Sequence, residues 1–107
     1  MIKHVVMWRF AKSAEGKSDA ENMAIVRERL LALPAIIPEI KMMEVGRDVS
    51  RTDMSYDMML VTEFDTLEAL HTYKVHEAHV AVAQYVAKVT TARVVLDAEM
   101  DGSGALI

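Results

Sequence analysis

Residues 2–10 of the 107-residue chain read Ile2-Lys3-His4-Val5-Val6-Met7-Trp8-Arg9-Phe10. This stretch is predicted to be a β-strand, because β-branched and aromatic residues dominate it and it is too short for a typical helix. Side chains alternate between the two faces of a strand. One face therefore carries Ile2, His4, Val6, Trp8 and Phe10, and the other carries Lys3, Val5, Met7 and Arg9. Both faces hold apolar side chains, and an extended apolar surface should not face water.

A helix is predicted to follow this strand after a loop at residues 11–17. Ser18-Asp19-Ala20-Glu21 fits a capping box, in which the Ser18 hydroxyl accepts from a free amide and Glu21 reaches back. Pro34 and Pro38 bracket the end of the helix, because proline removes a donor and disfavours helix at the preceding residue. The apolar stripe at helical spacing consists of Met23, Val26, Leu30 and Leu33, widened by Ile25 and Leu31.

A second helical region is predicted from Asp65 or Thr66, either of which can serve as the N-cap, to about residue 89. It is expected to be split near Val75 into a short helix and a longer one. The apolar stripe of the longer helix is Val82, Ala83, Val86 and Val89.

Three further strands are predicted at residues 40–49, 56–64 and 92–100, the first of them bent at Gly46. A polar loop at residues 50–55 joins the first two, and residues 101–107 form a tail after a single domain at residues 1–100. The order strand, helix, strand, strand, helix, strand predicts a ferredoxin-like α+β sandwich. In this fold both helical regions cover one face of a four-stranded antiparallel sheet.

The sheet face away from the helices is predicted to be an interface. Its expected apolar centre is Val5, Met7, Met59, Val61 and Val95, and its expected charged border is Lys3, Arg9, Asp57, Glu63, Arg93 and Asp97. A charged rim around an apolar centre is typical of protein interfaces. We therefore expect a homodimer whose two sheets pack face to face, with a monomer as the alternative.

Composition limits the classes of partner. The net charge of -4 and the pI near 5.5, without a dense cluster of Lys and Arg, argue against nucleic-acid binding. The absence of Cys excludes disulfides, thiolate nucleophiles and Cys-based metal sites. No segment approaches membrane-spanning length, and the opening residues resemble a strand rather than a signal segment, so we expect no membrane partner and a cytoplasmic location.

Proton-transfer chemistry is expected at Leu70-His71-Thr72-Tyr73-Lys74-Val75-His76-Glu77-Ala78-His79, because histidine titrates near neutrality. His79 falls in the first turn of the longer helix, where burial and the helix dipole both disfavour its charged form and leave it able to accept a proton. Tyr73 would donate a hydrogen bond to a substrate oxygen, and His4 would polarise an oxygen from the sheet side. The alternative is that these side chains are structural and satisfy backbone groups where the helix breaks.

Five ordered segments carry a family resemblance. They are Lys3-His4-Val5-Val6-Met7-Trp8-Arg9-Phe10, Ile37-Pro38, Val45-Gly46-Arg47-Asp48-Val49, Tyr56-Asp57, and Tyr73 followed by His76-Glu77-Ala78-His79. Together they resemble the stress-responsive A/B barrel (Dabb) domain over roughly residues 1–100. The resemblance implies a dimeric α+β barrel. The family includes a polyketide cyclase that closes an aromatic ring by aldol condensation, and the positions matching its site are His4, Tyr73 and His79. His76 matches a further motif histidine, and Glu77 stands where the family usually has proline.

The favoured function is small-molecule binding with cofactor-free acid–base catalysis, as in a lyase or cyclase acting on a carbonyl-rich substrate. The expected catalytic residues are His4, Tyr73 and His79, and the expected substrate contacts are Trp8, His76 and Met58. Met58 is one of nine methionines, which suit either core filling or an adaptable cavity wall.

Two alternatives remain open: a stress-related binding protein without turnover, and a cofactor-independent monooxygenase of the dimeric α+β barrel superfamily. A metal site at His4, His76 and His79 is not expected, because carboxylate or Cys partners are missing. No cofactor is expected either.

Overall fold

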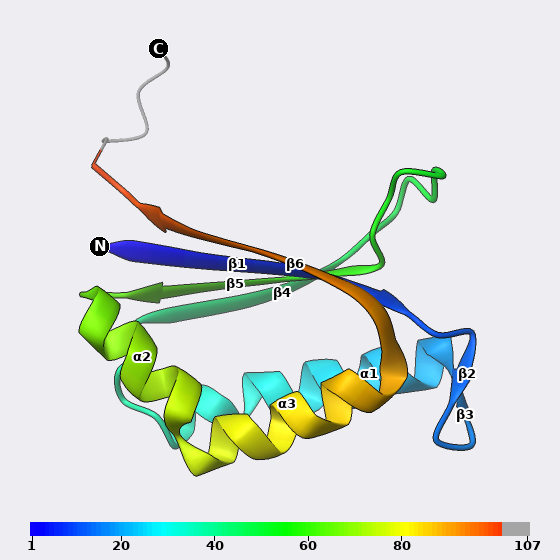
Figure 1. Cartoon of the computed structure of the whole chain (residues 1–107), viewed down its shortest axis with the longest axis horizontal. Helices are drawn as coiled ribbons and strands as arrows, with labels where there is room; N and C mark the ends of the chain where they lie inside the picture. The colour runs from blue at the N-terminus through cyan, green and yellow to red at the C-terminus, as the bar shows by residue number, and fades with distance from the viewer. Residues whose placement is uncertain (102–107) are drawn as a thin grey trace.

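The fold has two layers, a four-stranded antiparallel sheet and a layer of helices on one of its faces (Figure 1). The structure, a computed structural model, describes residues 1–101, so the predicted tail beyond Asp101 lies outside the described residues. The sheet order is β4 (Met42–Arg47), β5 (Met58–Phe64), β1 (Ile2–Phe10) and β6 (Thr90–Glu99). The ferredoxin-like α+β sandwich predicted from the order of elements is confirmed.

Strand β1 lies inside the sheet, between β5 and β6, and is antiparallel to both. Its predicted bounds and its predicted alternation are both confirmed. Ile2, His4, Val6, Trp8 and Phe10 are buried against the helices, whereas Met7 on the other face is 36% exposed. The five buried positions of β1 therefore form the floor of the space between the layers.

Helix α1 (Asp19–Leu31) begins with the predicted capping box. The Glu21 amide donates to Ser18 Oγ at 3.2 Å, and the Ser18 amide donates to Glu21 Oε1 at 3.0 Å. The predicted stripe is too wide, because Leu31 is 38% exposed and the chain turns into a 3₁₀ helix, η1 (Leu33–Ala35). Asn22 is buried in the stripe instead, and its amide is satisfied by Ala14 O and the Tyr85 hydroxyl.

Helices α2 (Leu67–Val75) and α3 (Glu77–Val89) are separated at the single residue His76, which confirms the predicted break. Thr66 caps α2 through a 3.1 Å hydrogen bond from the Ala69 amide. His76 caps α3, because its Nδ1 accepts from the Ala78 amide at 3.0 Å. The break therefore changes the direction of the chain without leaving the first turn of α3 uncapped.

One local prediction is wrong, and the strand pairing bears on a second. The predicted loop at residues 11–17 contains a small hairpin, β2 (Ser13–Ala14) and β3 (Lys17–Ser18), closed by positive-φ residues Glu15 and Gly16. The β4–β5 pairing runs through Gly46 opposite Met59 without a shift in register, so β4 has no bulge there.

The face assignment of β6 is also wrong, with consequences for the site. Residues directly opposite each other in an antiparallel pair share a face. Leu96 lies opposite Val5, so it belongs to the open face. Arg93 lies opposite Trp8 and Asp97 opposite His4, which places both charged side chains on the helix side of the sheet. Val95 is on the helix side as well, and the rim predicted for the open face therefore loses Arg93 and Asp97.

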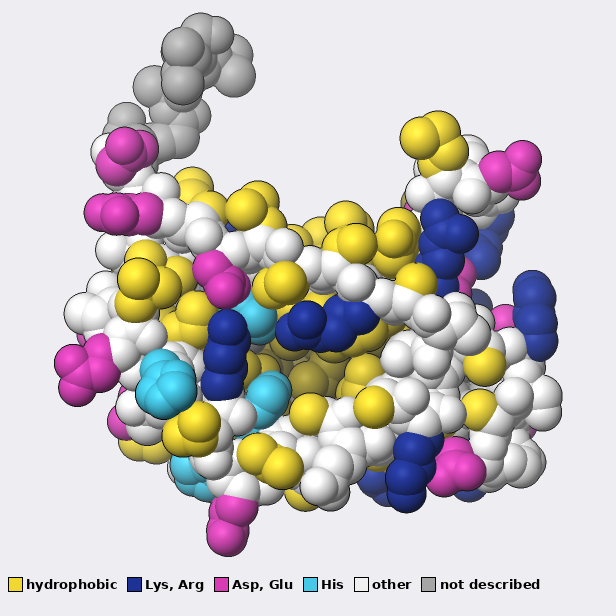
Figure 2. All heavy atoms as spheres, viewed as in Figure 1, with side chains coloured by type: hydrophobic (Ala, Val, Ile, Leu, Met, Phe, Trp, Pro, Cys, Tyr) yellow, Lys and Arg dark blue, Asp and Glu magenta, His cyan; other side chains and the backbone are white. Residues whose placement is uncertain are grey.

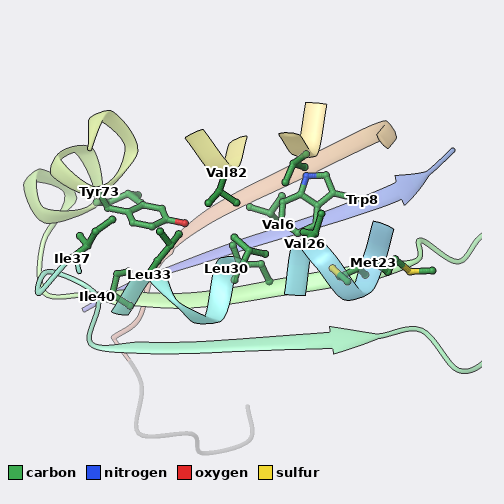
Figure 3. Close-up of a cluster of buried hydrophobic side chains, with 14 of the residues drawn as sticks. Val6, Trp8, Met23, Val26, Leu30, Leu33, Ile37, Ile40, Tyr73 and Val82 are labelled. Atoms are coloured by element: carbon green, nitrogen blue, oxygen red, sulfur yellow. The ribbon is translucent and has the colours of Figure 1, made fainter. Parts of the chain in front are cut away.

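The core fills the space between the two layers (Figure 3). Tyr73 reaches into it from α2, with its hydroxyl directed toward the middle of the cluster, and Trp8 enters from β1. The other face of the sheet is open, and hydrophobic side chains gather along it (Figure 2). The large exposed side chains there are Met7, Met59, Val94 and Leu96. None of the helices within residues 1–101 is long and apolar enough to cross a membrane.

Candidate functional site

A cavity of about 130 Å³ lies between α3 and the β1–β6 side of the sheet. Figure 2 shows its mouth as a hollow with histidine and cationic side chains at the edge and hydrophobic side chains inside. The apolar walls include Val6, Trp8, Leu30, Leu60, Val82 and Val86. The polar groups in the lining are His4, Tyr73, His79, Thr90 and Arg93.

Tyr73 joins the polar groups of the cavity. Its side chain is fully buried, and the centre of its ring lies 4.4 Å from that of His79 and 6.2 Å from that of His4. Within residues 1–101 its hydroxyl has no hydrogen-bond partner. Burial raises the pKa of Tyr73 to about 12, so the phenol keeps its proton at neutral pH. The site thus contains a buried O–H donor that no group within residues 1–101 uses.

His79 is held at the start of α3 by the chain that precedes the helix. Its Nδ1 lies 2.9 Å from the carbonyl oxygen of Lys74. Because a carbonyl only accepts, Nδ1 carries the hydrogen and Nε2 is the nitrogen with the free lone pair in the neutral ring. Burial lowers the pKa of His79, and the positive charges of Arg93 and Lys74 act in the same direction. His79 is therefore neutral at pH 7, with a basic nitrogen at Nε2.

His4 forms a pair with Asp97 across the β1–β6 ladder. The ring is only 3% exposed, and its Nδ1 contacts Asp97 Oδ1. Burial lowers the pKa of His4 and outweighs the opposite effect of the Asp97 carboxylate. The neutral ring then donates its Nδ1 hydrogen to Asp97, which again leaves Nε2 as the acceptor.

Asp97 also accepts from Lys74 Nζ at 3.5 Å. Burial would raise the pKa of Asp97, but the hydrogen bond from His4 and the charge of Lys74 together lower it. The carboxylate therefore stays ionised and can fix the orientation of His4. Lys74 serves both histidines, since its backbone holds His79 and its side chain contacts the partner of His4.

Of the six residues predicted for the site, four meet at the cavity: His4, Tyr73, His79 and Trp8. The indole Nε1 of Trp8 is buried without a hydrogen-bond partner among residues 1–101. His76 and Met58 do not line the cavity. The His76 ring is used to cap α3, and Met58 is buried next to Trp8 in the β1–β5 register.

Arg93 and Asp97 were missed at the sequence level. The sequence alone assigns both to the open face. Alternate residues of β6 can be assigned to the two faces of the sheet in two ways, and apolar residues occur in both sets. Only the pairing of β6 with β1 decides which set of residues faces the helices. Among the described residues, no three His, Asp or Glu side chains are grouped as metal ligands.

The geometry defines a ferredoxin-like α+β sandwich with a histidine- and tyrosine-lined cavity between its layers. The family model for the stress responsive A/B barrel domain (Dabb) matches residues 2–100. The chain belongs to this family, as the resemblance of its motifs indicated.

Solved structures of the same fold come from several organisms. A dimeric ferredoxin-like protein from Bacteroides fragilis is 27% identical, with a TM-score of 0.75, and the match covers 92% of this chain and 95% of that one. A dimeric ferredoxin-like protein from Thermobifida fusca is 25% identical, with a TM-score of 0.80 and coverage of 92% and 90%.

A hydroxynitrile lyase from Passiflora edulis is 15% identical, with a TM-score of 0.81 and coverage of 97% and 96%. At that identity the likeness shows the fold alone. A comparison with curated proteins finds no match.

Proposed function

We propose that the chain binds a small carbonyl-containing molecule and transforms it by cofactor-free acid–base catalysis. One observation carries this proposal: Tyr73, whose buried hydroxyl has no partner within residues 1–101, lines a cavity together with two neutral histidines, His4 and His79. Each histidine has Nδ1 engaged by the protein, so each has Nε2 left for a ligand. Buried polar groups without partners are rare in folded proteins, and a purely structural cluster would have no reason to keep one.

The reaction class that suits these groups is carbon–carbon bond formation through an enolate. Nε2 of His79 takes a proton from a carbon next to a carbonyl, and the Tyr73 hydroxyl donates to the oxygen on which negative charge develops. The enolate carbon then attacks a second carbonyl carbon, and the new alkoxide takes the proton back from His79. His4, oriented by Asp97, accepts at Nε2 from a hydroxyl or enol O–H of the substrate. Every proton is returned, and no oxidant is consumed.

The size of the cavity limits the substrate. Its volume of about 130 Å³ is below the roughly 300 Å³ at which ligand pockets usually begin. No carboxylate from residues 1–101 lines its apolar walls. We therefore propose a small substrate, or one reactive end of a longer one, with apolar carbon next to the reacting carbonyl.

The experiment is a cyclisation assay with a short poly-β-ketone, followed by mass spectrometry of the product. His79→Ala and Tyr73→Phe should each abolish product formation, whereas His71→Ala, which changes an exposed histidine on α2, should not. If the substrate binds without turnover and His4→Ala and His79→Ala change only its affinity, the protein is a binding protein. Oxygen uptake with hydroxyquinol-like substrates would instead support a monooxygenase.

We also propose that two copies associate through the open sheet face. Met7, Met59, Val94 and Leu96 form an exposed apolar surface on this face. The B. fragilis and T. fusca proteins are both described as dimeric. Such a dimer leaves the cavity accessible, because the cavity opens on the helix side of the sheet. The cytoplasmic location remains a prediction.

A further inference from the structure

We infer that the ligand of this cavity is a small carboxylate, whose charged end is bound by Arg93 at the mouth while its apolar part enters the cavity. The inference rests on the proposed site and names its substrate class. It depends on three features of Arg93: its place at the cavity, its lack of an ionic partner among the described residues, and the charge of the surrounding groups.

Arg93 reaches the cavity from the edge of the sheet. It lies opposite Trp8 in the β1–β6 pairing, so its side chain is on the helix side, and β6 has no further strand beyond it. Arg93 lines the cavity and is itself exposed. A guanidinium in this position is in contact with both the ligand space and solvent. The open face proposed for dimer contacts does not include it.

The guanidinium of Arg93 is unpaired in the part of the chain that the structure describes. Within residues 1–101 it forms no ion pair, whereas nearby Lys74 is paired with Asp97 at 3.5 Å. The Asp97 carboxylate is already engaged by His4 and Lys74. Among residues 1–101, Arg93 is the only one lining the cavity that has a formal charge at neutral pH once the two histidines are neutral, and no Asp or Glu of this part of the chain lines it. The ligand site is therefore electropositive at its mouth and uncharged inside.

A carboxylate matches this pattern. The planar guanidinium offers two parallel N–H donors to the two oxygens of a carboxylate, which fixes orientation as well as charge. Because the mouth is exposed, the anion keeps part of its hydration and avoids the cost of complete burial. The apolar walls formed by Val82, Val86 and Leu30 then favour a hydrocarbon segment attached to it. Bound this way, the ligand presents its uncharged end toward Tyr73.

Hexanoate and its uncharged analogue hexanamide are suitable probes, and their dissociation constants can be measured by ligand-observed NMR. The wild-type protein should bind hexanoate about ten-fold more tightly than hexanamide, since a charge-assisted pair is worth more than a neutral hydrogen bond. Arg93→Gln should weaken hexanoate binding about ten-fold and leave hexanamide within about two-fold. Added salt should weaken hexanoate binding to the wild type more than to this variant.

Arg27→Gln is the matched control, because it removes the same charge from an exposed position on α1 that does not line the cavity. It should leave the affinities for both probes unchanged. Equal losses of hexanoate affinity in the two variants would show a general effect of net charge and overturn the inference. No hexanoate binding to the wild type at millimolar concentration would overturn it as well.

The test separates this inference from the proposed reaction. Tyr73→Phe should lose turnover but keep the preference for hexanoate over hexanamide. If no substrate is turned over and the preference still depends on Arg93, the proposed reaction fails and the carboxylate site stands. If turnover depends on His79 and Tyr73 but the preference for hexanoate does not depend on Arg93, the proposed reaction stands and the carboxylate site fails.

Discussion

The carbonyl oxygen of Lys74 lies 2.9 Å from Nδ1 of His79, across the break that separates α2 from α3. A continuous helix would use this carbonyl in its own hydrogen-bond ladder, because the carbonyl of residue i accepts from the amide of residue i+4. The break at His76 frees it for a side chain instead. The helix interruption thus fixes the tautomer of the proposed base, and the same region places Tyr73 beside it.

The first prediction separates a functional from a structural role for Tyr73. Tyr73→Phe should leave the melting temperature unchanged or slightly higher, because the hydroxyl is buried and has no partner among residues 1–101. The same change should lower kcat about 100-fold, since it removes the donor to the developing oxyanion. Thermal unfolding and steady-state kinetics on one preparation measure both effects.

Tyr85→Phe is the matched control for Tyr73→Phe. The Tyr85 hydroxyl donates to Asn22 Oδ1 at 2.6 Å and belongs to the packing of α1 against α3. Its removal should cost about 1 kcal/mol of unfolding free energy, because buried Asn22 loses a partner, and should leave kcat unchanged. A destabilised Tyr73→Phe variant with normal kcat would assign Tyr73 to the structure alone.

The second prediction concerns the pH dependence of the reaction. The proposed base acts only when neutral, so kcat/KM should rise with pH through the pKa of His79 and then stay level. Burial and the nearby cations lower this pKa below 6.5, which places the acid limb below pH 6.5. The pKa of Tyr73, raised to about 12, predicts no loss of the donor at moderately alkaline pH.

NMR titration of the His79 ring tests whether the loss of activity at acid pH follows the protonation of His79. Arg93→Gln should raise the pKa of His79 toward its ordinary value, because the arginine charge disfavours the imidazolium. A rate profile whose acid midpoint lies above 6.5, or a His79 pKa that is indifferent to Arg93, would contradict the proposed electrostatics.

The third prediction is that Asp97 positions His4. Asp97→Asn removes the carboxylate that accepts the Nδ1 hydrogen, so the ring is no longer held in one tautomer. We expect kcat to fall about 10- to 100-fold, in the range found for losing a charge-assisted hydrogen bond. The pKa of His4 should also fall further, because Asp97 is the group that raises it.

Glu99→Gln is a control on the same strand, at an exposed position outside the cavity. It should change neither kcat nor the titration of His4. A purely structural role for Asp97 would lower stability without altering the pKa of His4, and the NMR titration distinguishes the two roles.

The sequence predicted the layers because their signals are local. The Ser18 capping box, the Thr66 cap and the alternation in β1 each depend on a few neighbouring residues. The meeting of His4, Tyr73 and His79 at one cavity was predicted with help from the family resemblance. His76 was expected at the substrate, but a histidine at a helix junction can be used by the backbone, and here its Nδ1 is.

The roles of Arg93 and Asp97 depend on a non-local feature, the register of β6 against β1. A shift of one residue would exchange the two faces of the strand, and Val94, Val95 and Leu96 make either choice plausible. The distance of 93 residues along the chain between His4 and Asp97 explains why no local pattern reveals their pairing.

The last prediction uses this register to test the dimer. Leu96 is 64% exposed on the open face, and Val95 is 48% exposed on the helix side of the same strand. Leu96→Asp should convert a dimer into a monomer in analytical ultracentrifugation, because it places two charges in an apolar interface. Val95→Asp introduces the same charge one residue away, but on the helix side of the sheet. This variant should therefore remain dimeric. If Val95→Asp dissociates the protein and Leu96→Asp does not, the interface is on the other side of the sheet. If the wild-type protein sediments as a monomer at micromolar concentration, the proposed association is wrong.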